Sequence, residues 1–364
     1  MDNHTPELVR SSHPPHAGRL NRQSGLSLVE LMISVTIGLM LMAGITSLIA
    51  QQSSASTELD KASRQIENGR YASQVLREDV ELAGFYGEFY NVPAPTTIVD
   101  PCDKTIATLA SAISLPIQGY DSPATVPSPL SACLANGNHV SGTDILIVRH
   151  AETSTVDVAS AVAGQPYLQS GINVSNTMAF VVGSGSDTSV FTLKRRTGGT
   201  APLRAYAVHI YFVSPCNVPA SGTTCNGSTD DGGTSIPTLK RMELTVSGGA
   251  AAFTTVALAE GIENMQLDYG IDSETSPDGS ANYYTTGTNT DAGVAMTAAD
   301  WGNIMTIRVN LLARNTERTL TYDDKKTYSL GTAGTVGPFH DSYKRRVFSE
   351  VIRATNPSGR RPLS

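Results

Sequence analysis

The feature that most constrains this chain is an apolar stretch from Gly25 to Ala50 that carries one charged side chain, Glu30. As a helix rising about 1.5 Å per residue, it would be roughly 37 Å long, enough to cross a hydrocarbon core about 30 Å thick. No proline interrupts it, and Gly38 and Gly44 are tolerated in membrane helices. An ionisable group inside such a segment costs roughly 2.5–3.5 kcal/mol, so we expect Glu30 to have a partner or a role.

Residues 1–25 are predicted to be a leader on the cytoplasmic side of the membrane. They carry Arg10, Arg19 and Arg22 against Asp2 and Glu7, and their prolines disfavour a stable helix. Because this basic flank precedes the span, the bulk of the chain is expected outside the cytoplasm. A cleavable secretory peptide fits less well, since the apolar run is too long and no small-x-small site ends it. An ordinary signal anchor with an incidental carboxylate is the remaining alternative.

The residues around Gly25 closely resemble the type III (prepilin) signal of type IV pilins and type II secretion pseudopilins. Basic residues precede Gly25, and Glu30 is the fifth residue after it. The resemblance implies that a prepilin peptidase cuts between Gly25 and Leu26, that Leu26 is then N-methylated, and that Glu30 acts in assembly. The family most often has Phe where this chain has Leu26. A neighbouring subunit's Leu26 amine could neutralise Glu30 and set the register between subunits.

An amphipathic helix is predicted to continue in water from Gln51 to about Gly84. Apolar residues recur at three- and four-residue steps, with charged residues, Asp79 among them, on the wet face between them. The apolar positions are Leu59, Ala62, Ile66, Ala72, Val75 or Leu76, Val80 and Ala83. This stripe would pack on a globular domain, and Gly84 would end the helix. A dimeric coiled coil is the alternative, although the heptad is irregular.

Beyond Tyr90 the pattern changes to that of strands. Residues 91–134 are rich in Pro, Thr and Ser and are expected to be loop with short elements. Strands are predicted at 145–148, 179–182, 190–193, 205–213, 242–246, 262–269, 307–311 and 343–352. Long loops are expected at 217–235 and 272–300. These patterns predict an α+β fold in which an antiparallel β domain lies against a helical spine. Two lobes are possible, with 217–235 the likeliest divider.

Several blocks are similar to the PilW family of minor pilins. The helical stretch contains Gln65-Ile-Glu-Asn-Gly-Arg-Tyr-Ala72 and then Leu82-Ala-Gly-Phe-Tyr-Gly87, followed by Glu88 where the family usually has cysteine. Further blocks lie at 142–149, 260–270, 301–314 and 343–348. The resemblance implies a pilin-like division into a leader (1–25), an assembly helix (26–50), a spine helix (51–85) and a β-rich domain (86–364).

The four cysteines are Cys102, Cys133, Cys216 and Cys225. None is in a C-x-x-C motif or has a histidine at metal-ligand spacing. An even number in a loop-rich, exported sequence favours two disulfides. Three connectivities are possible, of which the local pairing, 102 with 133 and 216 with 225, is the simplest. Free buried thiols are the alternative.

We find no sequence motif for catalysis, a cofactor or a metal. His209 lies within a predicted strand and is expected to be structural. Asp230-Asp231 and Asp272-Ser-Glu274 with Asp278 could form calcium loops, but solvated turns fit better because neither has a full ligand spacing. Charged residues are 16% of the chain, the net charge is −7, and no basic stripe occurs, so nothing suggests nucleic-acid binding.

The resemblance implies a minor pilin that primes or caps a type IV pilus. It would sit in the inner membrane with its β domain in the periplasm, then reach the pilus and the cell surface. Its partners would be the prepilin peptidase and N-methyltransferase, other minor pilins, the major pilin and a tip adhesin. The alternatives are a type II secretion pseudopilin, a membrane-tethered envelope enzyme, and a tethered module that binds sugar or calcium.

Overall fold

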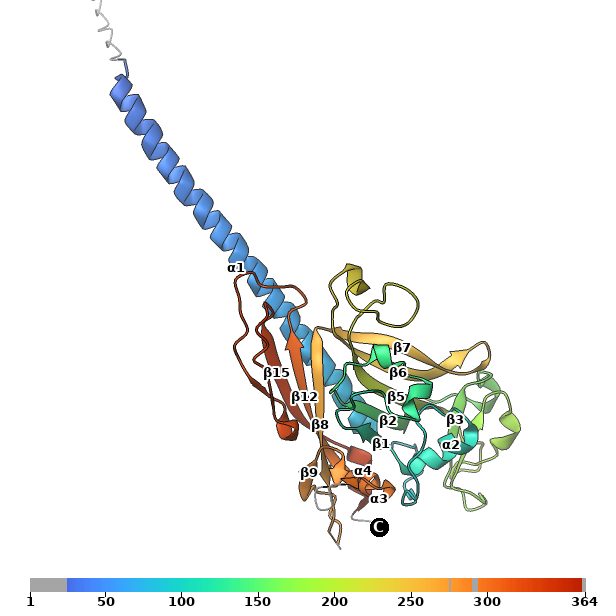
Figure 1. Ribbon diagram of the computed structural model, residues 1–364. Helices are drawn as coiled ribbons and strands as arrows, with labels where there is room; N and C mark the ends of the chain where they lie inside the picture. Colours follow the sequence, from blue (N-terminus) through green and yellow to red (C-terminus); the bar gives the residue numbers. More distant parts are fainter. Residues whose placement is uncertain (1–24, 275, 290–293, 362–364) are drawn as a thin grey trace, which may run out of the picture. The chain divides into compact units, whose positions relative to one another are not determined.

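The computed structural model describes residues 25–274, 276–289 and 294–361, so the predicted leader, residues 1–24, lies outside the described residues. The chain divides into two compact units, one ending at Thr57 and the other starting at Glu58. Helix α1 (Leu28–Leu82) contributes to both (Figure 1).

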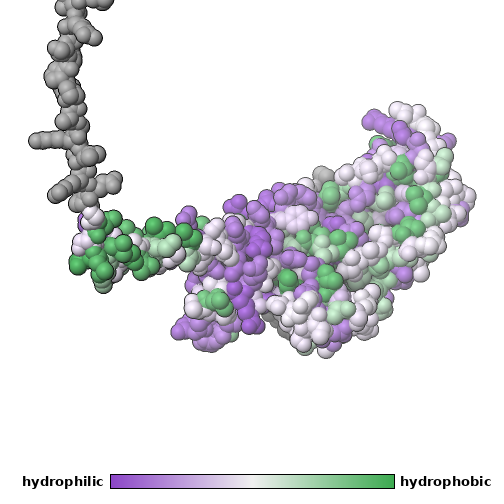
Figure 2. Space-filling model, turned by 90° about the horizontal axis from the view of Figure 1, so that it is seen from above, coloured by the Kyte–Doolittle hydropathy of each residue, from purple (hydrophilic) through white to green (hydrophobic). Residues whose placement is uncertain are grey.

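The first unit consists of the apolar start of α1. Its large side chains from Leu26 to Ile49 are exposed, and Figure 2 shows hydrophobic residues gathered on this part of the helix. The hydroxyls of Ser34, Thr36 and Thr46 donate to backbone carbonyls three or four residues earlier. Polar groups satisfied within the helix suit a lipid environment. Among the residues described, α1 is the one helix long and apolar enough to cross a membrane.

The second unit combines the end of α1 with two sheets. The larger, seven-stranded sheet contains β1 (Ile117–Tyr120), β2 (Ile145–Ala151), β3 (Pro166–Ser170), β4 (Phe180–Ser184), β5 (Leu203–Ser214), β6 (Thr238–Ser247) and β7 (Ala250–Glu260). The smaller, four-stranded sheet contains β8 (Ile262–Ile271), β9 (Tyr283–Thr285), β12 (Ile304–Arg314) and β15 (Arg345–Arg353). Two short ladders pair β10 (Thr288–Asn289) with β11 (Val294–Ala295) and β13 (Tyr328–Ser329) with β14 (Thr335–Val336).

Short helices connect the strands or follow the last of them. They are α2 (Ile106–Ser111), α3 (Ala298–Gly302), α4 (Thr355–Arg360) and the single 3₁₀ turns Ala112–Ser114, Leu130–Ala132, Asn136–Asn138, Val158–Ser160, Thr188–Val190, Asp230–Gly232 and Gly331–Ala333. All strand pairs among the described residues are antiparallel, as the sequence predicted. In the larger sheet, β5 pairs with β2, β3 and β6; in the smaller, β12 lies between β15 and β8.

One hydrophobic core joins the spine part of α1 to both sheets. Leu76 and Val80 of the helix share it with Val148 of β2 and with Leu267 and Ile307 of the smaller sheet, all fully or nearly fully buried. The loop 217–235 connects β5 to β6, which are neighbours in one sheet. The loop therefore does not divide two lobes, contrary to the sequence-based suggestion.

Most predicted strands are present, but there are differences. Residues 190–193 do not form a strand: Asp187 accepts a hydrogen bond from the Ser189 amide and caps a 3₁₀ turn at Thr188–Val190. The strands β1, β3 and β7 and the short strands β9, β10, β11, β13 and β14 were not predicted. For β7 a signal was present, since Gly248 and Gly249 both have positive φ and form the tight turn that leads from β6 into it.

The end of α1 agrees with the prediction of a stop at Gly84. Gly84 has φ +71°, the left-handed conformation that commonly closes a helix. The Asn356 amide donates to the carbonyls of Leu82 and Ala83, and the Arg360 guanidinium donates to that of Gly84 at 2.9 Å. The last carbonyls of the helix are thus satisfied by the C-terminal segment of the chain.

The buried stripe of the spine differs from the predicted one. Leu59 is exposed, whereas Gln65, Gly69 and Asp79 are buried along with Ala72, Leu76 and Val80. The Gln65 amide donates to the carbonyls of Ala313 (2.8 Å) and Lys344 (2.9 Å). Gln65, a polar residue of the block 65–72 that resembles the PilW family, therefore attaches the helix to the ends of strands.

Gly69 provides a test of this attachment. A Cβ at this position would overlap the Phe348 ring. Ala normally favours an inner helical position over Gly by roughly 1 kcal/mol, but overpacking costs typically about 1–3 kcal/mol. We expect Gly69→Ala to destabilise the second unit by about 2 kcal/mol in urea unfolding of the full chain in detergent, followed by the fluorescence of its single tryptophan, Trp301.

Because Phe348→Ala removes the obstructing ring, Gly69→Ala in that background should be neutral or stabilising. Equal losses from Gly69→Ala in both backgrounds would show that the contact between Gly69 and Phe348 does not set the cost.

Candidate functional site

The residues of the predicted processing and assembly signal lie together at the start of α1. Gly25 and Leu26 directly precede the helix, and Leu26 is 73% exposed. The helical hydrogen bonding begins with the Leu31 amide donating to the Ser27 carbonyl at 3.0 Å. Glu30 is exposed in the first turn, one helical turn beyond Leu26. The structure therefore places a carboxylate close to the chain end that cleavage after Gly25 would create.

The four cysteines form the two local disulfides, Cys102–Cys133 and Cys216–Cys225, with Cα–Cα distances of 5.6 and 5.8 Å. The simplest of the three predicted connectivities is confirmed. The first bridge spans 31 residues and ties the segment before α2 to the turn at Leu130–Ala132. The second closes the loop between β5 and β6.

The acidic residues of that loop organise its backbone. Asp230 is fully buried and accepts hydrogen bonds from the amides of Ala220, Asn226 and Gly227, which lower the pKa of its carboxyl. The prediction of a solvated turn is therefore wrong for Asp230. Its oxygens are occupied by N–H donors, which are not compatible with calcium coordination by the same oxygens.

Asp272 is also buried, again in contrast to the predicted solvated turn. Its carboxylate accepts a hydrogen bond from the Gly279 amide at 2.9 Å and lies 3.6 Å from the Arg361 guanidinium. The Asp272 carboxylate has a structural role, because it connects the loop after β8 to the C-terminal segment.

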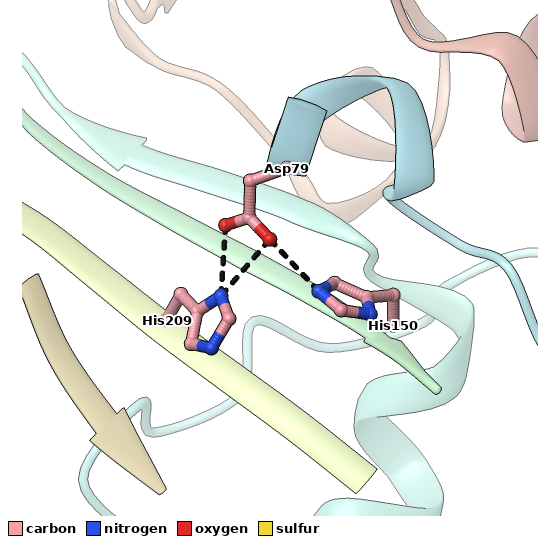
Figure 3. Close-up of side chains that lie close together, drawn as sticks. All are labelled: Asp79, His150 and His209. Atoms are coloured by element: carbon pink, nitrogen blue, oxygen red, sulfur yellow. Dashed lines mark hydrogen bonds and ion pairs between the residues drawn. The ribbon is translucent and has the colours of Figure 1, made fainter. Parts of the chain in front are cut away.

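The fold brings together Asp79 and His150, which are buried, and His209, which is partly buried, in one cluster (Figure 3). Asp79 comes from α1, His150 from β2 and His209 from β5. The Asp79 Oδ1 atom lies 2.8 Å from His150 Nε2 and 2.9 Å from His209 Nδ1, and Asp79 Oδ2 lies 3.0 Å from His209 Nδ1. One carboxylate therefore faces two imidazoles and joins the helix to the sheet.

The hydrogen bonds of His150 define its chemical state. Its Nδ1 lies 3.1 Å from the Ala151 carbonyl, and its Nε2 faces the Asp79 carboxylate. Because both partners are acceptors, both ring nitrogens are satisfied when the ring is an imidazolium or when a cation replaces the proton on Nε2.

The charges in this cluster shift two pKa values. Burial alone would raise the pKa of Asp79, but the charge of His209 and the hydrogen bonds of both histidines lower it well below the usual value. Burial alone would lower the pKa of His150, but its hydrogen bond to Asp79 and the Asp79 charge raise it. The Asp79 carboxylate and the His150 imidazole are thus held as an ion pair.

Sequence reasoning placed Asp79 on the wet face and missed this cluster. A signal was available, because Asp79 continues the alternating three- and four-residue spacing of Gln65, Gly69, Ala72 and Leu76. His209 was expected to be structural and does contact the spine helix, but its partners come from elements far apart in sequence. No single-sequence pattern pairs a histidine in β5 with a carboxylate in α1.

A surface pocket adjoins the cluster. Its lining includes Glu78, Glu152 and Arg241 beside Asp79, His150 and His209. The Arg241 guanidinium is paired with Glu243, with Nε 2.8 Å from Oε1. The lining contains no serine, threonine or cysteine that could act as a nucleophile. The arrangement is suited to holding a proton or a cation between carboxylate and imidazole groups.

Comparisons with known proteins matched two parts of the chain. Residues 227–356 match the family model of the type IV pilus-assembly protein W (PilW), and residues 20–46 match the prokaryotic N-terminal methylation motif. Neither the curated proteins nor the solved structures gave a match.

The PilW match includes the blocks 260–270, 301–314 and 343–348, whereas the helical block and 142–149 lie outside it. The methylation motif includes Gly25, Leu26 and Glu30 and implies processing by a prepilin peptidase and association with pilus components. Together with the apolar helix it supports anchoring in the inner membrane. Together with a long N-terminal helix followed by an antiparallel β domain, these matches support a type IV pilin of the PilW family.

Proposed function

We propose that this protein is a minor pilin that primes or caps the type IV pilus, as a structural subunit and not as an enzyme. The peptidase trims the chain after Gly25, Leu26 is methylated, and the apolar part of α1 holds the protein in the inner membrane with the β domain in the periplasm. The observation that carries this proposal is the methylation motif on an exposed apolar helix in the same chain as a PilW match.

Assembly would use the exposed side chains of α1. Transfer of the helix from lipid into a bundle with the major and other minor pilins exchanges lipid contacts for helix packing. Glu30, one turn from the new amino terminus, would be neutralised by a neighbouring subunit's Leu26 amine, so the contact sets register while removing a buried charge. The β domain would then face other minor pilins or a tip adhesin at the end of the pilus and at the cell surface.

A type II secretion pseudopilin would carry the same N-terminal signal, but the PilW match favours the pilus. A tethered enzyme or binding module would use its helix only as an anchor. A pilus subunit and a membrane-tethered protein differ in their need for Glu30, because a tether works equally well without this carboxylate.

The first test is the intact mass of the protein from membranes and from sheared pili, in strains with and without the prepilin peptidase. We expect a mature chain that starts at N-methylated Leu26 in the sheared fraction, and an uncut chain confined to membranes when the peptidase is absent. An uncut chain confined to membranes in both strains would overturn the proposal.

The second test compares Glu30→Ala with Glu67→Ala, which removes an exposed carboxylate from the spine part of the same helix. We expect both variants to be cleaved and membrane-bound, but Glu30→Ala to be depleted at least tenfold from sheared pili. Equal incorporation of the two variants would contradict the assembly role of Glu30.

A further inference from the structure

We propose that Asp79, His150 and His209 bind one divalent transition-metal ion of the zinc class, and that this ion fastens the spine helix to the larger sheet. The site is independent of the assembly role proposed above, because all three residues lie in the second unit.

Two of the three distances between the ligand atoms are already close to those required. Asp79 Oδ1, His150 Nε2 and His209 Nδ1 all lie within 4.8 Å of one another. Tetrahedral ligand atoms about 2.0–2.1 Å from zinc are separated by about 3.3 Å. The carboxylate–imidazole distances of 2.8 and 2.9 Å would have to widen by only a few tenths of an ångström. A rotation of the Asp79 carboxylate or of either ring provides such a movement.

The surroundings of His150 match those of a metal ligand. Histidines that bind metals usually donate their other ring N–H to a carbonyl or a carboxylate, which fixes the tautomer. Here the Nδ1 of His150 faces the Ala151 carbonyl at 3.1 Å, so an N–H belongs on Nδ1. Its Nε2 faces the Asp79 carboxylate, either as a second N–H in the ion pair or, when a metal is bound, with its lone pair on the metal. Without a proton or a cation between them, this lone pair would meet a carboxylate oxygen.

Burial and charge also favour a cation. The side chains of Asp79 and His150 are 6% and 2% exposed, while His209 is 12% exposed and lies at the pocket. Glu78 and Glu152 add negative charge to the pocket lining, and the charge of Arg241 is balanced by Glu243. Three protein ligands leave a fourth position that water from the pocket can fill.

The donor set selects among cations. Two imidazoles and one carboxylate suit Zn²⁺, Ni²⁺ or Co²⁺, whereas Ca²⁺ and Mg²⁺ prefer oxygen ligands alone. His150 and His209 lie 71 and 130 residues from Asp79 in the sequence. A bound ion would therefore hold together three distant segments, and the stability of the folded unit would rise with the logarithm of the ion's free concentration above its Kd.

The test uses the full chain in detergent, purified without a histidine tag and stripped with a chelator. His4, His13 and His16 of the leader are replaced by glutamine in every sample, so that they cannot bind the added metal. Zn²⁺ is titrated in competition with a chromophoric chelator, and Co²⁺ is added separately to record its visible absorption. We expect one equivalent of Zn²⁺ bound below micromolar concentration, a tetrahedral Co²⁺ spectrum, and no competition from millimolar Mg²⁺.

Two single-histidine variants supply the comparison. His209→Gln should weaken Zn²⁺ binding at least 100-fold and abolish the rise in unfolding temperature that Zn²⁺ causes. His340→Gln removes an exposed histidine outside the cluster and should change neither. Circular dichroism checks that both variants are folded. A chain that binds no stoichiometric Zn²⁺ would overturn the proposal and leave the cluster as a hydrogen-bonded ion pair. Equal binding by the two variants would also overturn it.

Discussion

Replacing Arg345 with alanine is expected to destabilise the second unit by about 3–5 kcal/mol, because it leaves the fully buried Asp324 carboxylate without its cation. The Arg345 side chain is 1% exposed and contacts three acids. Its Nη1 lies 2.9 Å from Asp324, which is fully buried, its Nη2 lies 2.7 Å from Asp341, and its Nε contacts Glu263 of β8. This guanidinium joins β15, β8 and the loop that carries Asp324.

Arg346 is the matched control, since it is the next residue and its side chain is exposed. Arg346→Ala should cost less than about 1 kcal/mol. Urea unfolding of the full chain in detergent, followed by Trp301 fluorescence, gives both values. Arg345→Lys should also be strongly destabilised, because a single ammonium group cannot reproduce the contacts of one planar guanidinium with three carboxylates. If Arg345→Ala and Arg346→Ala unfold at the same urea concentration, the buried network contributes nothing to stability.

Removing the Cys102–Cys133 disulfide by the double substitution to alanine is expected to cost about 3–4 kcal/mol, more than removing Cys216–Cys225. In the chain-entropy description, a cross-link stabilises by restricting the unfolded chain, and the gain grows with the loop it closes. The first bridge has a sequence separation of 31 and the second of 9. The shorter loop corresponds to about 2–3 kcal/mol.

The same unfolding experiment, performed on the two double variants, tests this order. Non-reducing mass analysis first confirms that the remaining pair is oxidised in each variant. A larger loss on removing Cys216–Cys225 would contradict the loop-length argument, and would mean that folded-state packing of the loop between β5 and β6 determines its contribution.

The helix and most of the long strands could be predicted from the periodicity of their side chains. The apolar run of α1, its end at Gly84 and the strand runs of β2, β5, β6, β8 and β12 are visible in the sequence, because side-chain periodicity reflects which face is buried. Strand β7 was not predicted because its side chains are largely exposed and show little alternation between apolar and polar residues. Residues 190–193 have strand-forming composition, but the preceding Asp187 cap directs the chain into a turn.

The candidate site could be predicted only in part. Gly25, Leu26 and Glu30 are recognisable because their spacing along one short segment carries the signal. Asp79 and its two histidines are not, since their contact depends on how α1 packs against β2 and β5. Asp230 and Asp272 were misjudged for the same reason. Neither acidic segment has a full calcium-ligand spacing, which favoured solvated turns, and only the folded loops provide the donors that allow these residues to be buried.

The cap on the end of α1 has a consequence for the order of events during synthesis. Asn356 and Arg360, which complete the carbonyl hydrogen bonds of Leu82, Ala83 and Gly84, lie more than 270 residues further along the chain. The helix is synthesised before these residues, yet its far end can be closed only after translation has reached Arg360. A truncated product would keep its membrane anchor but would lack this closure, so an incomplete subunit differs from a finished one at the junction of helix and β domain.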